Sequence, residues 1–201
     1  MQVRQLSIPG ALEITPRQYG DNRGVFLEWF RADRLAEVIG HRFGLAQANL
    51  SVSARGVVRG IHFASVPPGQ AKYVTCVSGQ VLDVVVDLRM GSPTFGTWDS
   101  VVLDETDRRA VYLPEGLGHG FCALSESATV TYLCSEPYAP EREHAVNAFD
   151  PDLGIDWQAA DLTTSERDAG AASLAAVQGA GLLSDYAECV AYTRGLRSTA
   201  D

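Results

Sequence analysis

The sequence lacks long hydrophobic runs and clusters of basic residues, and each absence excludes a class of protein. No apolar stretch approaches the ~20 residues that cross a bilayer, so we expect no membrane-spanning helix. The 201 residues carry 16 Lys and Arg against 25 Asp and Glu, which gives a formal charge of −9. Because nucleic acid and anionic membranes bind basic surfaces, neither is expected as a partner.

Closely spaced cysteines and a secretory signal are also missing. The cysteines form no C-x-x-C pair, which favours free, buried thiols over a disulfide framework or a zinc site. They are Cys76, Cys122, Cys134 and Cys189. The first residues contain no basic segment followed by an apolar one, the pattern of a secretory signal. These features predict a cytoplasmic location.

Short apolar runs separated by Gly, Pro and Ser fill the chain between about residues 11 and 134. Such runs at this spacing are typical of strands in a β sandwich or barrel. The predicted strands are Ala11–Thr15, Val25–Trp29, Leu45–Val52, Val57–Phe63, Lys72–Val77, Val81–Leu88, Ser100–Leu103, Ala110–Leu113, Phe121–Leu124 and Thr129–Cys134.

Helices are predicted near the start of the chain and in its C-terminal tail. Leu35, Val38 and Ile39 follow the i, i+3, i+4 spacing of a helix that ends at Gly40. Residues 135–164 predict a long ordered connection, followed by helices over about 165–178 and 184–194. We therefore expect one domain over residues 1–201, with a β-barrel core (about 1–134) and a connection and helical tail (about 135–201) packed on it.

Two histidines stand in segments that resemble the half-motifs of cupin barrels. His62 lies in Gly-Ile-His-Phe, and His119 ends the Pro-x-Gly-x-x-His string. A catalytic metal normally needs three or more protein ligands, whereas these two histidines supply two and no His-x-His is present. The sequence therefore predicts no metal site.

Without a metal, these segments still carry groups for proton transfer. His62 can remove and return a proton near neutral pH, and Lys72 can stabilise an oxyanion. Tyr132 shares a strand face with Val130 and Cys134, from which its phenol can act as an acid. Each residue alone also fits an ordinary core or surface position. The catalytic interpretation therefore requires that the three side chains converge.

Ordered motifs from about residue 3 to residue 190 carry a family resemblance. They are Asp21-Asn-Arg-Gly-Val-Phe-Leu-Glu28, Gln47-Ala-Asn49, Gly56-Val-Val-Arg-Gly-Ile-His62, Ala71-Lys72, Gly91-Ser-Pro-Thr-Phe-Gly96, Gly118-His-Gly-Phe121, Tyr132-Leu-Cys-Ser135 and Asp150-Pro-Asp-Leu-Gly-Ile-Asp-Trp157. These motifs closely resemble the dTDP-4-dehydrorhamnose 3,5-epimerase (RmlC-like) family, in particular its actinobacterial antibiotic-deoxysugar branch.

The resemblance implies a mainly β fold, a cupin-like jelly-roll barrel with a short N-terminal helix and C-terminal helices. It also implies a homodimeric isomerase that uses no metal or other cofactor. Its substrate is a dTDP-linked 4-keto-6-deoxy sugar, whose C4 ketone acidifies the protons on C3 and C5. The enzyme inverts C3, C5 or both through an enolate.

The resemblance also assigns roles to residues. It makes His62 the base, Asp168 its partner, Tyr132 the opposing proton donor and Lys72 the group that stabilises the enolate. Asp168 also fits a helix capping box that begins at Ser165. The implied substrate-binding residues are Arg23, Phe26, Glu28, Gln47, Asn49, Arg59, His119, Tyr138 and Arg167.

Several other functions stay open at this point. A 3-only or 5-only epimerase and a related sugar 3,4-ketoisomerase are the nearest alternatives. A metal-dependent cupin enzyme and a non-catalytic nucleotide-sugar-binding protein are more distant ones, because the first lacks His-x-His and the second has no need of an acid/base set.

Overall fold

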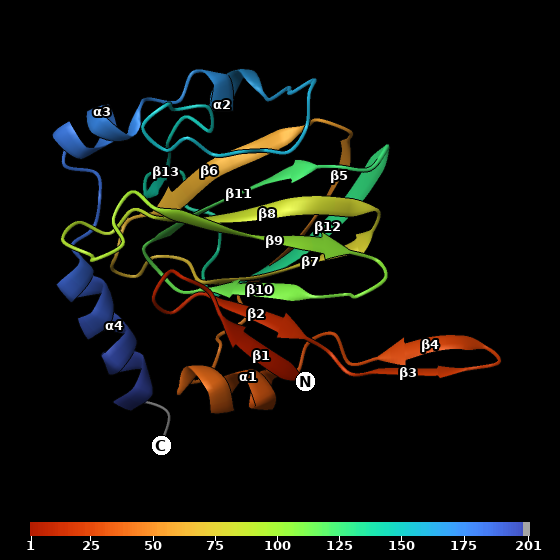
Figure 1. Cartoon of the computed structure of the whole chain (residues 1–201). Helices are drawn as coiled ribbons and strands as arrows, with labels where there is room; N and C mark the ends of the chain where they lie inside the picture. Colours follow the sequence, from red (N-terminus) through yellow and green to blue (C-terminus); the bar gives the residue numbers. More distant parts are fainter. Residues whose placement is uncertain (199–201) are drawn as a thin grey trace.

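Two antiparallel sheets packed face to face form the body of the molecule (Figure 1). The fold is known from a computed structural model that describes residues 1–198. In spatial order, the six-stranded sheet comprises β1 (Gln2–Gln5), β2 (Leu12–Thr15), β10 (Ala110–Leu113), β7 (Lys72–Ser78), β12 (Ser127–Cys134) and β5 (Gln47–Ala54). The five-stranded sheet comprises β13 (Glu143–Ala145), β6 (Val58–Ala64), β11 (Leu117–Ala123), β8 (Gln80–Asp87) and β9 (Trp98–Asp104).

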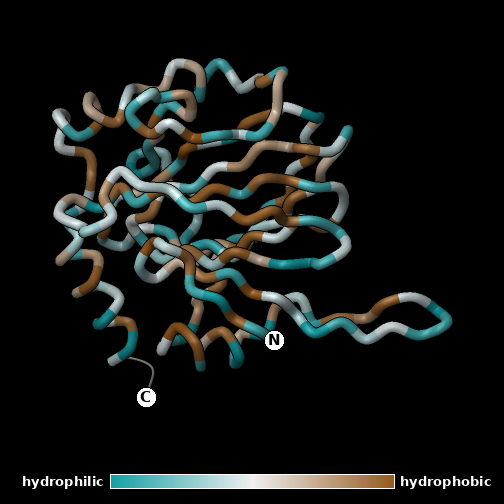
Figure 2. The backbone as a smooth tube through the Cα atoms, in the orientation of Figure 1, coloured by the Kyte–Doolittle hydropathy of each residue, from teal (hydrophilic) through white to brown (hydrophobic). Residues whose placement is uncertain are grey.

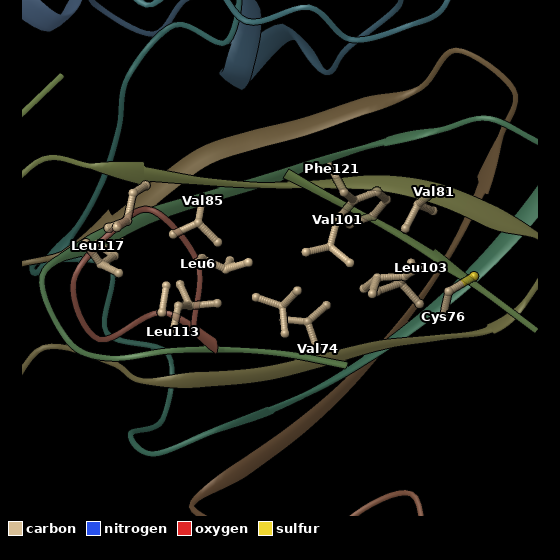
Figure 3. Close-up of a cluster of buried hydrophobic side chains, with 14 of the residues drawn as sticks. Leu6, Val74, Cys76, Val81, Val85, Val101, Leu103, Leu113, Leu117 and Phe121 are labelled. Atoms are coloured by element: carbon tan, nitrogen blue, oxygen red, sulfur yellow. The ribbon is translucent and has the colours of Figure 1, made fainter. Parts of the chain in front are cut away.

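The main core lies between these two sheets, where alternate side chains of each strand point inward (Figure 3). Val74 and Val111 of one sheet meet Val85 and Val101 of the other in a single buried cluster. Hydrophobic residues accordingly lie mainly along the strands, and the connecting loops are more hydrophilic (Figure 2). Burial of these side chains, at about 25 cal/mol per Å² of apolar surface, is the main force that holds the sheets together.

Each sheet also buries part of its outer face. Helix α1 (Ala32–Ile39) places Leu35 and Ile39 in a cluster with Tyr73 and Tyr112 of the six-stranded sheet. Leu82 of the five-stranded sheet packs with the segment after Cys134. β8 is therefore buried on both faces, which explains its nearly continuous apolar sequence.

Up to residue 198, the C-terminal segment contains three helices, α2 (Glu166–Ala169), α3 (Leu174–Gly179) and α4 (Tyr186–Ser198). Trp157 anchors this segment: its ring is buried, and its Nε1 donates a hydrogen bond to the Ala148 carbonyl over 2.9 Å. The C-terminal segment places α2 beside β6, where Asp168 contacts Gly60 and His62.

A two-stranded hairpin, β3 (Gln18–Asp21) and β4 (Gly24–Leu27), projects away from the sheets (Figure 1). All residues of β3 are exposed, and Phe26 of β4 is 68% exposed. An isolated two-stranded hairpin is only marginally stable in water. Exposed apolar side chains on such a hairpin are unusual.

The mainly β prediction is confirmed, and each predicted strand overlaps an observed one. The largest boundary difference is at β11, which begins at Leu117 instead of Phe121. β1, β3 and β13 were not predicted, because the first two are exposed throughout and β13 has only three residues. Within residues 1–198, no helix is long and apolar enough to cross a membrane.

The prediction of one helix over 165–178 is wrong. The segment forms α2 and α3, each with its own N-terminal serine cap: the hydroxyl of Ser165 accepts from Asp168 N–H, and that of Ser173 accepts from Ala176 N–H. A serine that caps a second helix start interrupts the first helix. The last helix is confirmed, although it runs from Tyr186 to Ser198.

Candidate active site

A cavity of about 380 Å³ gathers most of the predicted functional side chains. Strands of both sheets, two loops and the start of α2 supply its lining. The lining residues are Gln47, Asn49, Arg59, His62, Gln70, Lys72, His119, Phe121, Tyr132, Tyr138, Glu143, Ser165, Arg167 and Asp168. The structure therefore brings together all four predicted catalytic residues and six of the predicted binding residues, and the required convergence is met.

His62 and Asp168 form a hydrogen-bonded pair at the centre of this cavity. The imidazole Nε2 lies 2.8 Å from Asp168 Oδ1, and Oδ2 accepts the Gly60 backbone N–H over 3.3 Å. Burial opposes ionisation of Asp168, but the hydrogen bond and charge of His62 outweigh it and hold the pKa below its ordinary value. An ionised carboxylate only accepts, so in the neutral imidazole Nε2 carries the hydrogen and Nδ1 has the lone pair that can accept a proton.

Asp168 reaches His62 because its backbone and its side chain serve different partners. Its N–H donates to the Ser165 hydroxyl over 3.1 Å and completes the helix cap. Its carboxylate is turned away from that cap toward β6. Both sequence interpretations of Asp168, the capping box and the histidine partner, are thus compatible with its geometry.

Gly60 allows β6 to approach β11 closely beside the pair. Its φ of +113° is accessible mainly to glycine, and a Cβ there would lie 2.5 Å from the His119 carbonyl oxygen. The strand register places His62 directly opposite His119 and shifts between His119 and Phe121. This local geometry sets both histidines side by side.

A second histidine–carboxylate pair, which was not predicted, supports His119. His119 Nε2 lies 2.8 Å from Asp83 Oδ2, and Asp83 is fully buried in β8. The sequence signal was available, since Asp83 is a lone carboxylate inside the apolar run Val81–Val86. A buried charge of this kind normally has a partner.

Lys72 and Tyr132 reach the cavity from the six-stranded sheet and therefore face His62 from the opposite wall. Lys72, the only lysine in the chain, is 8% exposed. Burial lowers the pKa of its ammonium. Burial also raises the pKa of the Tyr132 phenol above its ordinary value, so the hydroxyl is protonated near neutral pH.

Further polar side chains line the same cavity. Gln47 Nε2 donates to Asn49 Oδ1 over 2.8 Å, and the Tyr138 backbone N–H donates to Gln47 Oε1 over 2.8 Å. Arg167 contacts the Tyr138 hydroxyl at 3.4 Å. Arg59 donates to Ser53 Oγ over 3.0 Å. Gln47 and Asn49 thus lie on one face of β5, the face that lines the cavity.

Three predicted binding residues lie outside this cavity. Arg23 and Phe26 belong to the projecting hairpin, where Arg23 pairs with Asp21 over 2.5 Å. Glu28 follows the hairpin and pairs with Arg31 at 3.1 Å. A single chain therefore does not bring these side chains to His62.

The charge around the cavity differs in sign from the charge of the whole chain. Three cations, Arg59, Lys72 and Arg167, line the cavity together with two carboxylates, Glu143 and Asp168. In the part of the chain that the structure describes, no group of three or more His, Cys, Asp and Glu side chains is arranged to hold a metal ion. The excess of cations suits an anionic ligand.

The two facing sheets and this constellation define a cupin-like barrel protein equipped for acid–base chemistry. Comparison with known proteins makes the identification specific. A family model described as dTDP-4-dehydrorhamnose 3,5-epimerase matches residues 5–176. The chain belongs to this family.

Individual relatives cover nearly all of the chain. A dTDP-4-dehydrorhamnose 3-epimerase of Streptomyces niveus is 60% identical, over 96% of this chain and 93% of its own. A dTDP-4-dehydrorhamnose 3,5-epimerase of Mycolicibacterium smegmatis is 58% identical, over 98% of each chain. The crystal structure of ChmJ, a 3′-monoepimerase from Streptomyces bikiniensis in complex with dTDP-quinovose, has a TM-score of 0.93 and 48% identity, and covers 96% of this chain and 98% of its own.

Proposed function

We propose that this protein is an epimerase that inverts C3, C5 or both of a dTDP-4-keto-6-deoxyhexose during the biosynthesis of deoxysugars for antibiotics. The observation that carries the proposal is the convergence of His62, Asp168, Tyr132 and Lys72 on one cavity. Membership of an epimerase family gives the same activity class. The dTDP-sugar bound by the Streptomyces bikiniensis relative supports the substrate class.

The proposed reaction begins when Nδ1 of His62 removes the proton from a carbon next to the C4 ketone. The two electrons of the C–H bond form the C=C bond of an enolate, and the C4 oxygen gains the negative charge. Asp168 stabilises the imidazolium that results, because its carboxylate lies 2.8 Å from Nε2. The ammonium of Lys72 stabilises the enolate oxygen.

Inversion requires that a proton arrive from the other face of the sugar. Tyr132 lies on β12 and His62 on β6, so the two groups belong to facing sheets. The protonated phenol gives its proton to the carbon, and the enolate electrons form the new C–H bond. His62 then releases its proton and Tyr132 regains one, with water as the exchange partner.

Cationic and polar residues hold the dTDP portion in this proposal. Arg59 and Arg167 match the oxygens of a diphosphate, since a guanidinium binds them bidentately. His119 meets the sugar or the diphosphate. Gln47, Asn49 and the exposed ring of Tyr138 hold the nucleotide.

Incubation with dTDP-4-keto-6-deoxyglucose in D₂O, followed by NMR, tests the activity. Deuterium at C3 only, C5 only or both positions would define the specificity. Movement of the carbonyl to C3 would indicate a ketoisomerase instead. No exchange at C3 or C5 would refute the proposed function.

A homodimer completes the site in this proposal. The hairpin projects from its own barrel with Phe26 exposed, and β5 is an edge strand whose outer residues Leu50 and Val52 are also exposed. We infer that each hairpin enters the cavity of a second copy and adds Arg23, Phe26 and Glu28 to it. Burial of these apolar side chains would stabilise the pair.

Mixing two inactive variants tests this arrangement, with dimer formation measured by light scattering. The His62→Ala chain retains Arg23 in its hairpin, and the Arg23→Ala chain retains His62 in its cavity. Their mixed dimer contains one site with both His62 and Arg23, so activity should reappear after mixing. No recovery, or a monomer in solution, would contradict the exchange of hairpins.

Two further features belong to the proposal. The catalytic unit spans barrel and tail as one domain, because the barrel supplies His62 and the tail supplies Asp168. A cytoplasmic location is supported by the four cysteines, which are all buried free thiols.

A further inference from the structure

Gln70 lies in the loop between β6 and β7 and is almost fully buried beside Lys72. Its Oε1 accepts a hydrogen bond from the Lys72 ammonium. Its Nε2 donates to the Glu136 carbonyl over 2.9 Å and contacts Glu143 Oε1 at 3.5 Å. These donor contacts fix the orientation of the amide, so that its oxygen faces the ammonium.

Lys72 has an unusual environment for a buried cation. Among residues 1–198, no carboxylate forms an ion pair with it, although Glu143 lines the same cavity and its charge favours the ammonium, raising the pKa of Lys72 against the effect of burial. Cys134 lies opposite Lys72 in the strand register, and burial raises the pKa of its thiol, so the thiol is neutral. Besides Glu143, the titratable groups that line the cavity are Arg59, His62, His119, Tyr132, Tyr138, Arg167 and Asp168.

We propose that Gln70 is a positioning residue that holds the Lys72 ammonium through a neutral acceptor and keeps it separate from the Glu143 carboxylate. Gln70 does not touch the reacting atoms in this proposal. It acts through Lys72 and sets both the location and the free charge of the ammonium.

A neutral acceptor suits the proposed reaction, on which this inference rests, better than a carboxylate would. A direct ion pair would cancel much of the ammonium charge before the enolate forms. An amide oxygen satisfies one N–H without a carboxylate in direct contact, and so leaves more of the positive charge for the C4 oxygen, where negative charge develops. The Gln70 amide therefore gives the buried Lys72 ammonium a hydrogen-bond acceptor, and the ammonium still has no carboxylate in direct contact.

The sole lysine allows a direct test by NMR. Protein labelled with [ε-¹³C]lysine gives one lysine resonance, whose shift against pH reports the pKa of Lys72. The Gln70→Glu variant should raise this pKa by about one unit or more, because it supplies a carboxylate at the same place. The Gln70→Leu variant should lower it, because the ammonium loses its acceptor.

Activity provides the second arm. Both variants should lower kcat for deuterium exchange by about tenfold or more, with KM within about twofold of the wild type. Gln178→Leu, on the exposed face of α3, is a matched control that should change neither the titration nor kcat. Thermal unfolding of each variant checks the fold, and Gln70→Asn replaces Gln70→Leu if that chain does not fold.

Each result bears on a different claim. Opposite pKa shifts with a loss of kcat support the positioning role. An unchanged titration in the folded Gln70 variants, or a wild-type kcat in Gln70→Glu, would overturn it. Absence of exchange by the wild type would instead refute the proposed function, while the titration would still report on the Gln70–Lys72 contact.

Discussion

Replacement of Asp168 by asparagine tests how the carboxylate supports His62. The substitution keeps the size of the side chain and leaves its backbone N–H free to donate to Ser165 Oγ. It removes the negative charge that lies beside Nε2. We therefore expect the fold to persist while the imidazolium formed during proton removal becomes less stable.

The size of the effect follows from the geometry. Two unit charges about 4 Å apart interact by about 4 kcal/mol at an effective dielectric constant of about 20. The His62 side chain is 36% exposed, so solvent screening reduces this to about 2–4 kcal/mol. Because about 1.4 kcal/mol corresponds to tenfold, kcat should fall by between about 30-fold and 1,000-fold.

The assay is the rate of deuterium incorporation from D₂O into dTDP-4-keto-6-deoxyglucose at saturating substrate. Asp152→Asn, an exposed carboxylate in the tail, is the matched control and should keep the wild-type rate. A folded Asp168→Asn variant with a rate within about threefold of the wild type would refute the electrostatic role assigned to Asp168.

Three further substitutions give distinct outcomes. Tyr132→Phe should lower the rate of inversion by about 10²-fold or more, as NMR of the product would show, while exchange of the proton removed by His62 persists. Equal losses of inversion and of exchange would contradict the assignment of Tyr132 as a separate proton donor. Gly60→Ala should lower the free energy of unfolding, measured in urea, by about 1–3 kcal/mol, because the φ of this residue is +113° and the new Cβ meets a backbone oxygen. An unchanged midpoint of urea unfolding would be inconsistent with this geometry. Burial raises the pKa of Glu115 to about 7 from its ordinary 4.5, so the wild type should lose stability as pH rises through this interval. Glu115→Gln should remove that loss and gain up to roughly 3 kcal/mol relative to the wild type between pH 4.5 and 7, whereas parallel stability curves would contradict the pKa.

Most of the site could be predicted from the sequence because its residues lie in recognisable strings. Gln47 and Asn49 follow the strand period, so their common face was predictable without a structure. Asp168 is different, since 106 positions separate it from His62 and only the packing of the tail on β6 joins them. The family resemblance supplied that pairing, and local periodicity alone could not.

The parts that were missed depend on tertiary contacts. Gln70 and Glu143 acquire their significance only where a loop and the short strand β13 meet Lys72. The helix predicted over 165–178 is divided because Ser173 caps the start of a second helix. Helical propensity alone does not predict this break. The hairpin residues Arg23 and Phe26 lie in a segment whose proposed partner is another copy, so one chain does not show what they bind.

Comparison of the wild type with His62→Ala tests whether His62 removes the proton next to the ketone. Both proteins would be incubated with dTDP-4-keto-6-deoxyglucose in D₂O, and deuterium at C3 and C5 would be followed by NMR. The wild type should exchange deuterium, and the folded variant should lose this exchange. A His62→Ala protein that exchanges at the wild-type rate would contradict it.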